Sequence, residues 1–154
     1  MPRARTKRQT SLSSRHRAPL PFQVFISHSS HDAWVAGQIG KEIEALGATI
    51  ALDKHFLKGG DDINKKIIEE IRKSTEVIVL LSPESQKSQW VPTEVGMALA
   101  LDKYLTPILY NVLPEEMMRP LQVVKAIDLN DFDSFLIELR QRIKKKERID
   151  RKRR

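Results

Sequence analysis

The 154-residue sequence predicts an α/β, flavodoxin-like fold with three layers, built on a five-stranded parallel sheet of order 2-1-3-4-5. Short apolar runs rich in β-branched residues recur along the chain, and amphipathic stretches with helical spacing separate them. The run at 77–81 is apolar at every position, as a central strand covered on both faces requires. Because parallel strands are joined by crossing helices, five such units in this length favour a single doubly wound domain.

The expected strands are apolar segments bounded by turn residues. Pro21 and a serine pair flank the first one, and Gly47 is a helix stop that precedes the second. The predicted strands are Phe22–Ser27, Ala48–Leu52, Glu76–Leu81, Leu105–Tyr110 and Val123–Leu129.

The expected helices carry apolar residues at intervals of three and four. Asp61 or Asp62 caps the second helix, and Ser88 caps the third with Pro92 in its first turn, where a missing N–H costs little. The predicted helices cover residues 32–46, 63–74, 88–102 and 131–146. The loop at 53–62 is long for this kind of connection and contains two glycines, which is typical of functional loops.

The charge pattern divides the chain into a basic leader at 1–20, a domain at 21–143 and a basic tail at 144–154. The net charge of +7 comes from +6 in residues 1–18 and +6 in residues 144–154, against −5 in between. Such tails are typical of solvated, disordered segments that bind nucleic acid or anionic lipid weakly. No aromatic residue interleaves the basic ones, so we expect no specific nucleic-acid partner.

The composition excludes several other classes of protein. Without cysteine there is no disulfide framework and no cysteine-ligated zinc. No apolar run approaches the ~20 residues that span a bilayer, and no apolar segment near the start resembles a secretory signal. The leader is rich in arginine and serine and free of acids, as organelle transit peptides are, but it lacks an amphipathic stripe. We therefore expect no membrane span and a cytoplasmic location.

The stretch after the third strand carries the main candidate site. Trp90 and Glu94 lie four residues apart, so they share one face near the start of a helix. The predicted strand order brings this helix start beside the end of the first strand, at the switch point where α/β sheets bind ligands. Ser27, Ser29 and Phe56 should then lie close by. In the alternative interpretation, Trp90 packs in the core and Glu94 is a surface charge.

Other chemistries fit the sequence poorly. Neither phosphate-binding glycine motif is present, and Ser27 and His28 are neighbours on a strand, pointing to opposite faces, without a nucleophile elbow. A metal site at His28, His31 and Asp32 lacks a clear further ligand, so we expect no metal. A phosphorylated receiver needs acidic residues after the first strand, where this chain has Ser27-His28-Ser29.

Two stretches resemble the Toll/interleukin-1 receptor (TIR) domain family. One is VFISHSSHD at 24–32, and the other is the S-x-W-x-x-x-E-x-x-x-A-L pattern at 88–99. The long loop that Asp53 opens matches the family in position and length. The resemblance covers about residues 21–143 and is nearest to short bacterial members with NAD+ hydrolase or cyclase activity.

The resemblance implies a hydrolase that cleaves the nicotinamide–ribose bond of NAD+, giving ADP-ribose or a cyclic ADP-ribose. NAD+ is then the substrate, and no cofactor is expected. Glu94 is the implied catalytic residue, and the implied substrate-binding residues are Ser27, His28, Ser29, Asp53, Phe56 and Trp90. Because nicotinamide leaves as a neutral group from a cationic pyridinium, one carboxylate can suffice, unlike the pair that ordinary glycosidases use.

The resemblance also implies self-association through TIR–TIR contacts and a separate sensor or effector protein, in immune signalling that in bacteria would be antiphage defence. Two alternatives stay open. One is a non-enzymatic TIR adaptor or scaffold that acts through self-association alone. The other is a nucleic-acid-binding protein that uses its basic tails.

Overall fold

The computed structural model describes residues 20–52 and 62–153. Residues 1–19 of the predicted leader, and the loop residues Asp53 and Phe56, lie outside the described residues. Within the described ranges the strands form one parallel sheet of order β2-β1-β3-β4-β5, which confirms the predicted fold class. The strands are β1 (Gln23–Ser27), β2 (Thr49–Leu52), β3 (Glu76–Leu81), β4 (Tyr104–Leu109) and β5 (Ile127–Asp128).

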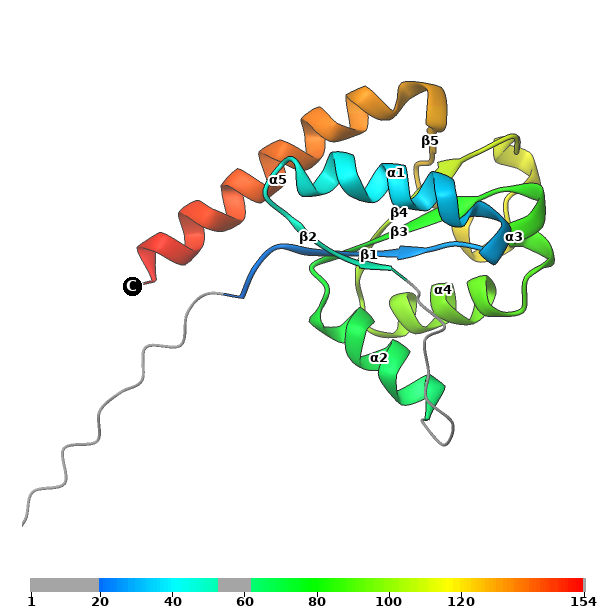
Figure 1. The fold of residues 1–154 in the computed structure, drawn as a ribbon, viewed down its shortest axis with the longest axis horizontal. Helices are drawn as coiled ribbons and strands as arrows, with labels where there is room; N and C mark the ends of the chain where they lie inside the picture. The colour runs from blue at the N-terminus through cyan, green and yellow to red at the C-terminus, as the bar shows by residue number, and fades with distance from the viewer. Residues whose placement is uncertain (1–19, 53–61, 154) are drawn as a thin grey trace, which may run out of the picture.

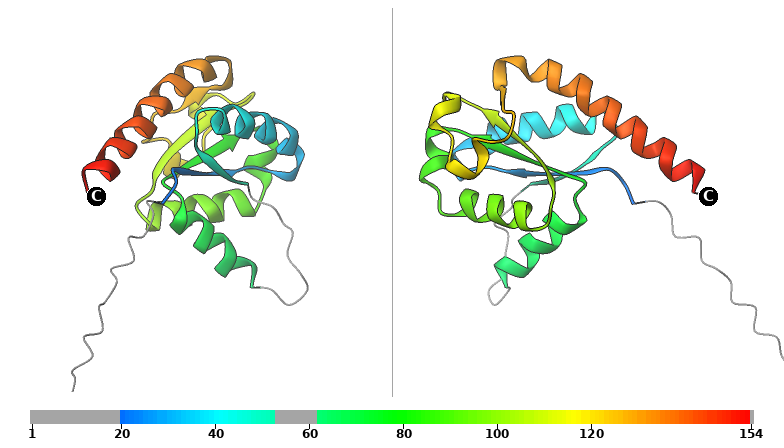
Figure 2. Two further views of the ribbon diagram at one scale, coloured as in Figure 1. Left: turned by 60° about the vertical axis from the view of Figure 1, so that its left-hand side comes forward. Right: turned by 180° about the vertical axis from the view of Figure 1, so that it is seen from behind.

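Helices cover both faces of the sheet (Figure 1). Helices α1 and α5 lie on one face, and α2 and α4 lie on the other, an arrangement also seen in the two views of Figure 2. The α-helices are α1 (Ala33–Glu44), α2 (Ile63–Lys73), α3 (Pro83–Lys87), α4 (Trp90–Ala100) and α5 (Phe132–Lys152). Short 3-10 turns are η1 (Ser30–Asp32), η2 (Pro114–Glu116), η3 (Arg119–Leu121) and η4 (Leu129–Asp131).

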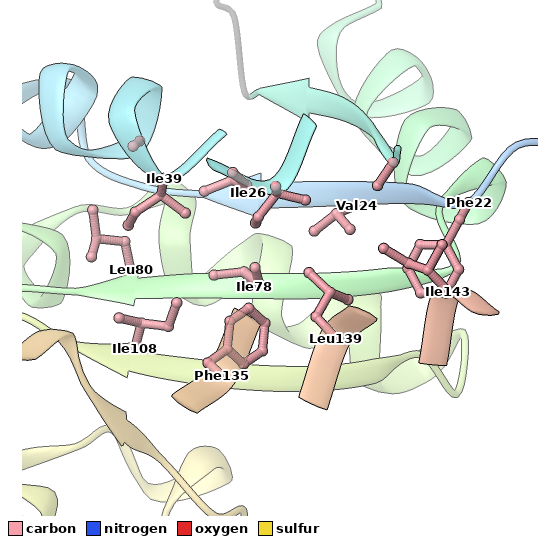
Figure 3. Close-up of a cluster of buried hydrophobic side chains, with 13 residues drawn as sticks. Phe22, Val24, Ile26, Ile39, Ile78, Leu80, Ile108, Phe135, Leu139 and Ile143 are labelled. Atoms are coloured by element: carbon pink, nitrogen blue, oxygen red, sulfur yellow. The ribbon is translucent and has the colours of Figure 1, made fainter. Parts of the chain in front are cut away.

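The central strand β3 supplies side chains to two separate cores. Ile78 and Leu80 face α1 and α5, whereas Val77 and Val79 face α2 and α4, because successive side chains alternate across a strand. Figure 3 shows the core beneath α1 and α5, where α5 contributes Phe135, Leu139 and Ile143. Every residue of β3 is buried, as predicted for a strand at the centre of the sheet.

Four boundaries differ from the sequence-based expectations. Helix α3 occupies part of a segment that was expected to be a loop, and α4 begins at Trp90, after Ser88. Strand β5 pairs over two residues only, so the expected strand at 123–129 is wrong over most of its length. Helix α5 continues to Lys152, so residues 144–152, expected in a solvated tail, extend the helix.

The inward face of α1 also differs at one position. Helical spacing predicts Trp34 on the apolar stripe together with Val35 and Leu46, but Trp34 is 75% exposed. The buried residues of α1 are Ala36, Ile39, Gly40 and Ile43.

An ion pair fastens α5 to the start of the central strand. Arg142 donates from Nε to Glu76 Oε1 at 2.6 Å and from Nη2 to Glu76 Oε2 at 3.1 Å. Its guanidinium lies over the Tyr104 ring, 4.9 Å from the centroid. Burial raises the pKa of Glu76 above its usual value, although Arg142 acts in the opposite direction. This cluster sits at the amino ends of the strands, away from the predicted site.

Candidate functional site

A hydroxyl and a carboxylate meet at the carboxyl end of β1. The Ser27 hydroxyl donates a hydrogen bond to Glu94 Oε2, and both side chains are fully buried. Ser27 is the last residue of β1, and Glu94 is the fifth residue of α4. The interpretation of Glu94 as a surface charge is therefore wrong. The predicted proximity of Glu94 to Ser27 is confirmed.

The fold brings these groups together through the strand register and the buried face of α4. Ser27 lies opposite Val79 in the β1–β3 ladder, next to the strand that leads into α3 and α4. Glu94 shares the buried face of α4 with Val91, Val95 and Ala98, so it lies among apolar side chains. A buried carboxylate without hydrogen bonds is costly, and the Ser27 hydroxyl supplies one.

His28 and Ser29 continue this edge of the sheet, and both are buried. The His28 Nδ1 atom lies 3.1 Å from the Ile26 carbonyl oxygen. Because a carbonyl oxygen only accepts, Nδ1 is the donor in this contact. The Ser29 hydroxyl donates to Asp32 Oδ2 at 2.6 Å.

A second buried polar group, which the sequence did not predict as a unit, joins the ends of β1 and β3. Asp32 Oδ2 accepts from the hydroxyls of both Ser29 and Ser82, the latter at 2.5 Å. Ser82 also caps α3 by accepting from the Ser85 N–H at 3.0 Å, and Ser85 Oγ accepts from the Ser82 N–H at 2.8 Å. Asp32 thereby fixes the two loops that flank the Ser27–Glu94 pair.

Trp90 occupies the first turn of α4, one turn before Glu94. Its side chain is half-buried and packs against the core beneath α2 and α4, and the backbone N–H of Trp90 donates to Ser88 Oγ at 3.2 Å. This packing anchors the start of the helix that carries Glu94. The proposed roles of Asp53 and Phe56 concern positions outside the described residues, so they stay predictions.

The observed contacts do not form the alternative catalytic arrangements. Ser27 bonds to Glu94, and His28 Nδ1 bonds to a backbone carbonyl, so these residues do not form a hydrolase triad. Among residues 20–52 and 62–153, no group of three His, Asp or Glu side chains is placed to hold a metal ion. In the same ranges, no helix combines the length and the apolarity that a bilayer span requires.

A helix-flanked parallel sheet with a buried carboxylate at its switch point defines an α/β domain with a candidate site at the β1–β3 edge. The family model for the TIR domain matches residues 24–143, and the chain belongs to the TIR domain family.

The relatives that the chain matches include two named as synthases and a receptor. It is 27% identical over 125 residues to "Probable 2' cyclic ADP-D-ribose synthase BdTIR" of Brachypodium distachyon, covering 78% of this chain and 55% of the relative. It is 30% identical over 116 residues to "Probable 2' cyclic ADP-D-ribose synthase TcpB" of Brucella abortus, and the match covers 72% of this chain and 46% of that relative. Human Toll-like receptor 1 is 36% identical over 80 residues, and the match covers 51% of this chain and 10% of the receptor. The chain thus spans about half of the two synthases.

Solved structures agree on the fold. The TIR domain of the Toll-related receptor TRR-2 from Hydra magnipapillata superposes with a TM-score of 0.64 at 22% identity, covering 80% of this chain and 97% of that one. A TIR-STING receptor from C. gigas, in complex with 2',3'-cGAMP, gives a TM-score of 0.64 at 25% identity, covering 76% and 38%.

Proposed function

We propose that this TIR domain is an NAD+ nucleosidase that cleaves the nicotinamide–ribose bond with Glu94 as its catalytic carboxylate. The observation that carries the proposal is the buried Ser27–Glu94 pair at the switch point of the sheet. Two relatives, at 27% and 30% identity, are named as probable cyclic ADP-ribose synthases, which supports a cyclic ADP-ribose as the product.

The chemistry needs one carboxylate and a place for the ribose. When the C–N bond breaks, positive charge develops on the sugar, and a carboxylate at this position stabilises it. The bonding electrons leave with nicotinamide, so no proton is needed for its departure. Attack by water then gives ADP-ribose, and attack by a hydroxyl of the same molecule gives a cyclic product. His28, which is buried at the same edge of the sheet, would border the substrate.

The burial of Glu94 adds a requirement. Its side chain has no exposed surface in this structure, so groups around it must move before a ribose can reach it. We propose that self-association between copies of the chain supplies this movement, in response to a separate sensor or effector protein. We also propose that the activity serves immune signalling in the cytoplasm, and antiphage defence if the host is a bacterium.

The second candidate is a non-enzymatic TIR adaptor. The same burial favours it, because a carboxylate that bonds to Ser27 inside the protein also serves as a structural link between β1 and α4. An adaptor would keep that link and self-associate without consuming NAD+.

Chromatography of the products separates the two candidates. Purified protein is incubated with NAD+ over a range of protein concentrations, beside Glu94→Ala. The enzyme hypothesis predicts that nicotinamide appears together with ADP-ribose or a cyclic ADP-ribose, and that both are lost in the variant. Intact NAD+ at every concentration, from protein that self-associates, would support the adaptor and contradict the enzyme.

A further inference from the structure

The carboxyl half of α5 carries a one-sided row of positive charge, which we call the basic stripe. All six of its side chains are exposed. At 100° per residue they fall within an arc of about 140°, and they extend over about 18 Å of helix. The basic stripe consists of Arg140, Lys144, Lys145, Arg148, Arg151 and Lys152.

The acids of this helix do not neutralise the basic stripe. Asp150 accepts from Lys146 at 2.9 Å, and Glu138 pairs with Arg142, and both of these cations lie on the partly buried side of α5. Glu147 flanks the stripe at one edge. None of the six stripe residues forms an ion pair within the described parts of the chain.

The basic stripe is displayed away from the domain. Figure 1 shows the carboxyl half of α5 reaching beyond the sheet, at the end opposite the carboxyl edge that holds Glu94. The chain also enters the domain here. Lys146 Nζ donates to the Leu20 carbonyl oxygen at 2.9 Å, and Pro21 and Phe22 line a pocket of about 250 Å³ against α5. Residues 1–18, which carry a net charge of +6, precede this point in the sequence.

We propose that the basic stripe binds the phosphodiester backbone of a double-stranded nucleic acid without reading its sequence. A duplex carries one negative charge per about 1.7 Å, so about ten phosphate charges lie along a length equal to the stripe. Arginine and lysine on a rigid helix meet this regular array at little entropic cost, and released counterions drive the binding.

The composition of the helix favours a duplex over a lipid surface. Helices that lie on membranes pair a basic face with a wide apolar face rich in Trp, Phe or Leu. Residues 144–153 hold one apolar side chain, Ile149, and no aromatic ring. The stripe also offers no aromatic platform for stacking unpaired bases, so contact with the backbone is the chemistry it supports.

Fluorescence anisotropy with the full chain and a labelled 20-base-pair DNA of arbitrary sequence tests this proposal. The stripe variant Lys144→Gln/Arg148→Gln/Arg151→Gln is compared with Lys41→Gln/Arg119→Gln/Lys125→Gln, which removes the same charge from exposed positions elsewhere. Glutamine is a good helix former, and circular dichroism verifies that both variants keep the native helix content.

The proposal predicts that the wild type binds the duplex and that its affinity falls steeply with salt. The stripe variant should bind about 100-fold more weakly in ~0.1 M salt, with the salt slope reduced by about 3, and the control should stay within threefold of the wild type. Equal affinity of both variants overturns the proposal. So does binding only to vesicles of phosphatidylserine and phosphatidylcholine, or stripe-dependent self-association without DNA. The same measurement with a 20-base-pair RNA duplex shows which nucleic acid binds more tightly. If the wild type binds neither duplex, the proposal is overturned.

Discussion

Ser27 and Glu94 are 67 residues apart in the chain and share one buried hydrogen bond. The strand order predicted from the sequence was sufficient to bring them to one edge, because neighbouring parallel strands place their carboxyl ends side by side. What the sequence could not predict is the depth of burial. Glu94 follows Val91 and precedes Val95 on a helix face that packs against the sheet, and only the tertiary packing decides how closely that face is covered.

Ser27→Ala removes one donor from a buried carboxylate. We expect the free energy of unfolding to fall by about 2 kcal/mol, because a buried acceptor loses a hydrogen bond and gains no water in its place. Urea unfolding followed by circular dichroism measures this. Exposed Ser30 on η1 gives the matched control, and Ser30→Ala should shift the unfolding midpoint little. Equal effects of the two substitutions would contradict the importance of this bond.

The sequence offers Asp32 as a metal ligand and as the last residue of the VFISHSSHD stretch. Its actual partners, the hydroxyls of Ser29 and Ser82, include one that lies 50 residues away. Serine and aspartate are common in turns, so neither the residue types nor their spacing reveals this contact. The S-S-x-D run after the first strand was the available signal. It contains Ser29 and Asp32 but not their third partner, Ser82.

Replacement of Asp32 by alanine should cost about 2 to 3 kcal/mol of unfolding free energy, since two buried hydroxyls lose their acceptor. Equilibrium urea denaturation again provides the measurement. Glu44→Ala, at an exposed position at the end of α1, should change stability by no more than about 0.5 kcal/mol. A loss of that small size for Asp32→Ala would show that the cluster does not hold the two loops.

Among the elements, α5 and β5 depart most from the expected boundaries. Lys and Arg favour helix, but a run of like charges also reads as a solvated tail, and the sequence alone did not decide between them. In the structure, Lys146 and Arg142 each find an acidic partner on the inner side of the helix. For β5, the apolar run at 123–127 suggested a full strand, yet its pairing with β4 is limited to Ile127 and Asp128.

The Glu76–Arg142 pair predicts how stability depends on pH. Arg142→Leu leaves the carboxylate of Glu76 buried without its cation, which should cost about 3 kcal/mol at pH 7. Burial raises the pKa of Glu76, so the folded state keeps its proton to a higher pH than the unfolded chain does. The stability from this group is complete below the unfolded pKa and is lost as the pH rises through the folded pKa.

The destabilisation by Arg142→Leu should therefore be smaller at pH 5 than at pH 7, because Glu76 is then neutralised more readily. Urea midpoints of the variant and the wild type at the two pH values give the comparison. Lys73→Leu, which removes the exposed ion pair with Glu70 on α2, serves as the control. Its effect on the urea midpoint should depend little on pH. A destabilisation by Arg142→Leu that grows as the pH falls would contradict the raised pKa of Glu76.

At the scale of the whole molecule, the proposed catalysis and the proposed nucleic-acid binding lie at opposite ends of the sheet. The carboxyl edge holds Glu94, and the opposite end holds the basic stripe and the entry of the chain. The buried position of Glu94 connects the proposed catalysis with the proposed assembly, because the carboxylate of Glu94 has no exposed surface in a single copy.

If assembly opens the site, the rate of NAD+ cleavage per chain should increase with protein concentration. Well below the dissociation constant of a two-copy assembly, a tenfold increase in concentration should give about a tenfold higher rate per chain, since mass action controls the fraction of assembled protein. Sedimentation under the same conditions reports the assembly directly. A rate per chain that stays constant while the protein changes from monomer to oligomer would contradict this link.

The most direct test of the central claim is nicotinamide release from NAD+ by concentrated wild-type protein, by Glu94→Gln and by Glu69→Gln. Glutamine keeps the size of the side chain and can still accept from Ser27, so the fold should persist, and Glu69 is an exposed glutamate on α2. We predict that Glu94→Gln lowers the rate at least ~100-fold, as expected when a charge that stabilises the transition state is removed, and that Glu69→Gln behaves as the wild type. Release by Glu94→Gln at the wild-type rate would contradict the assignment of Glu94 as the catalytic residue.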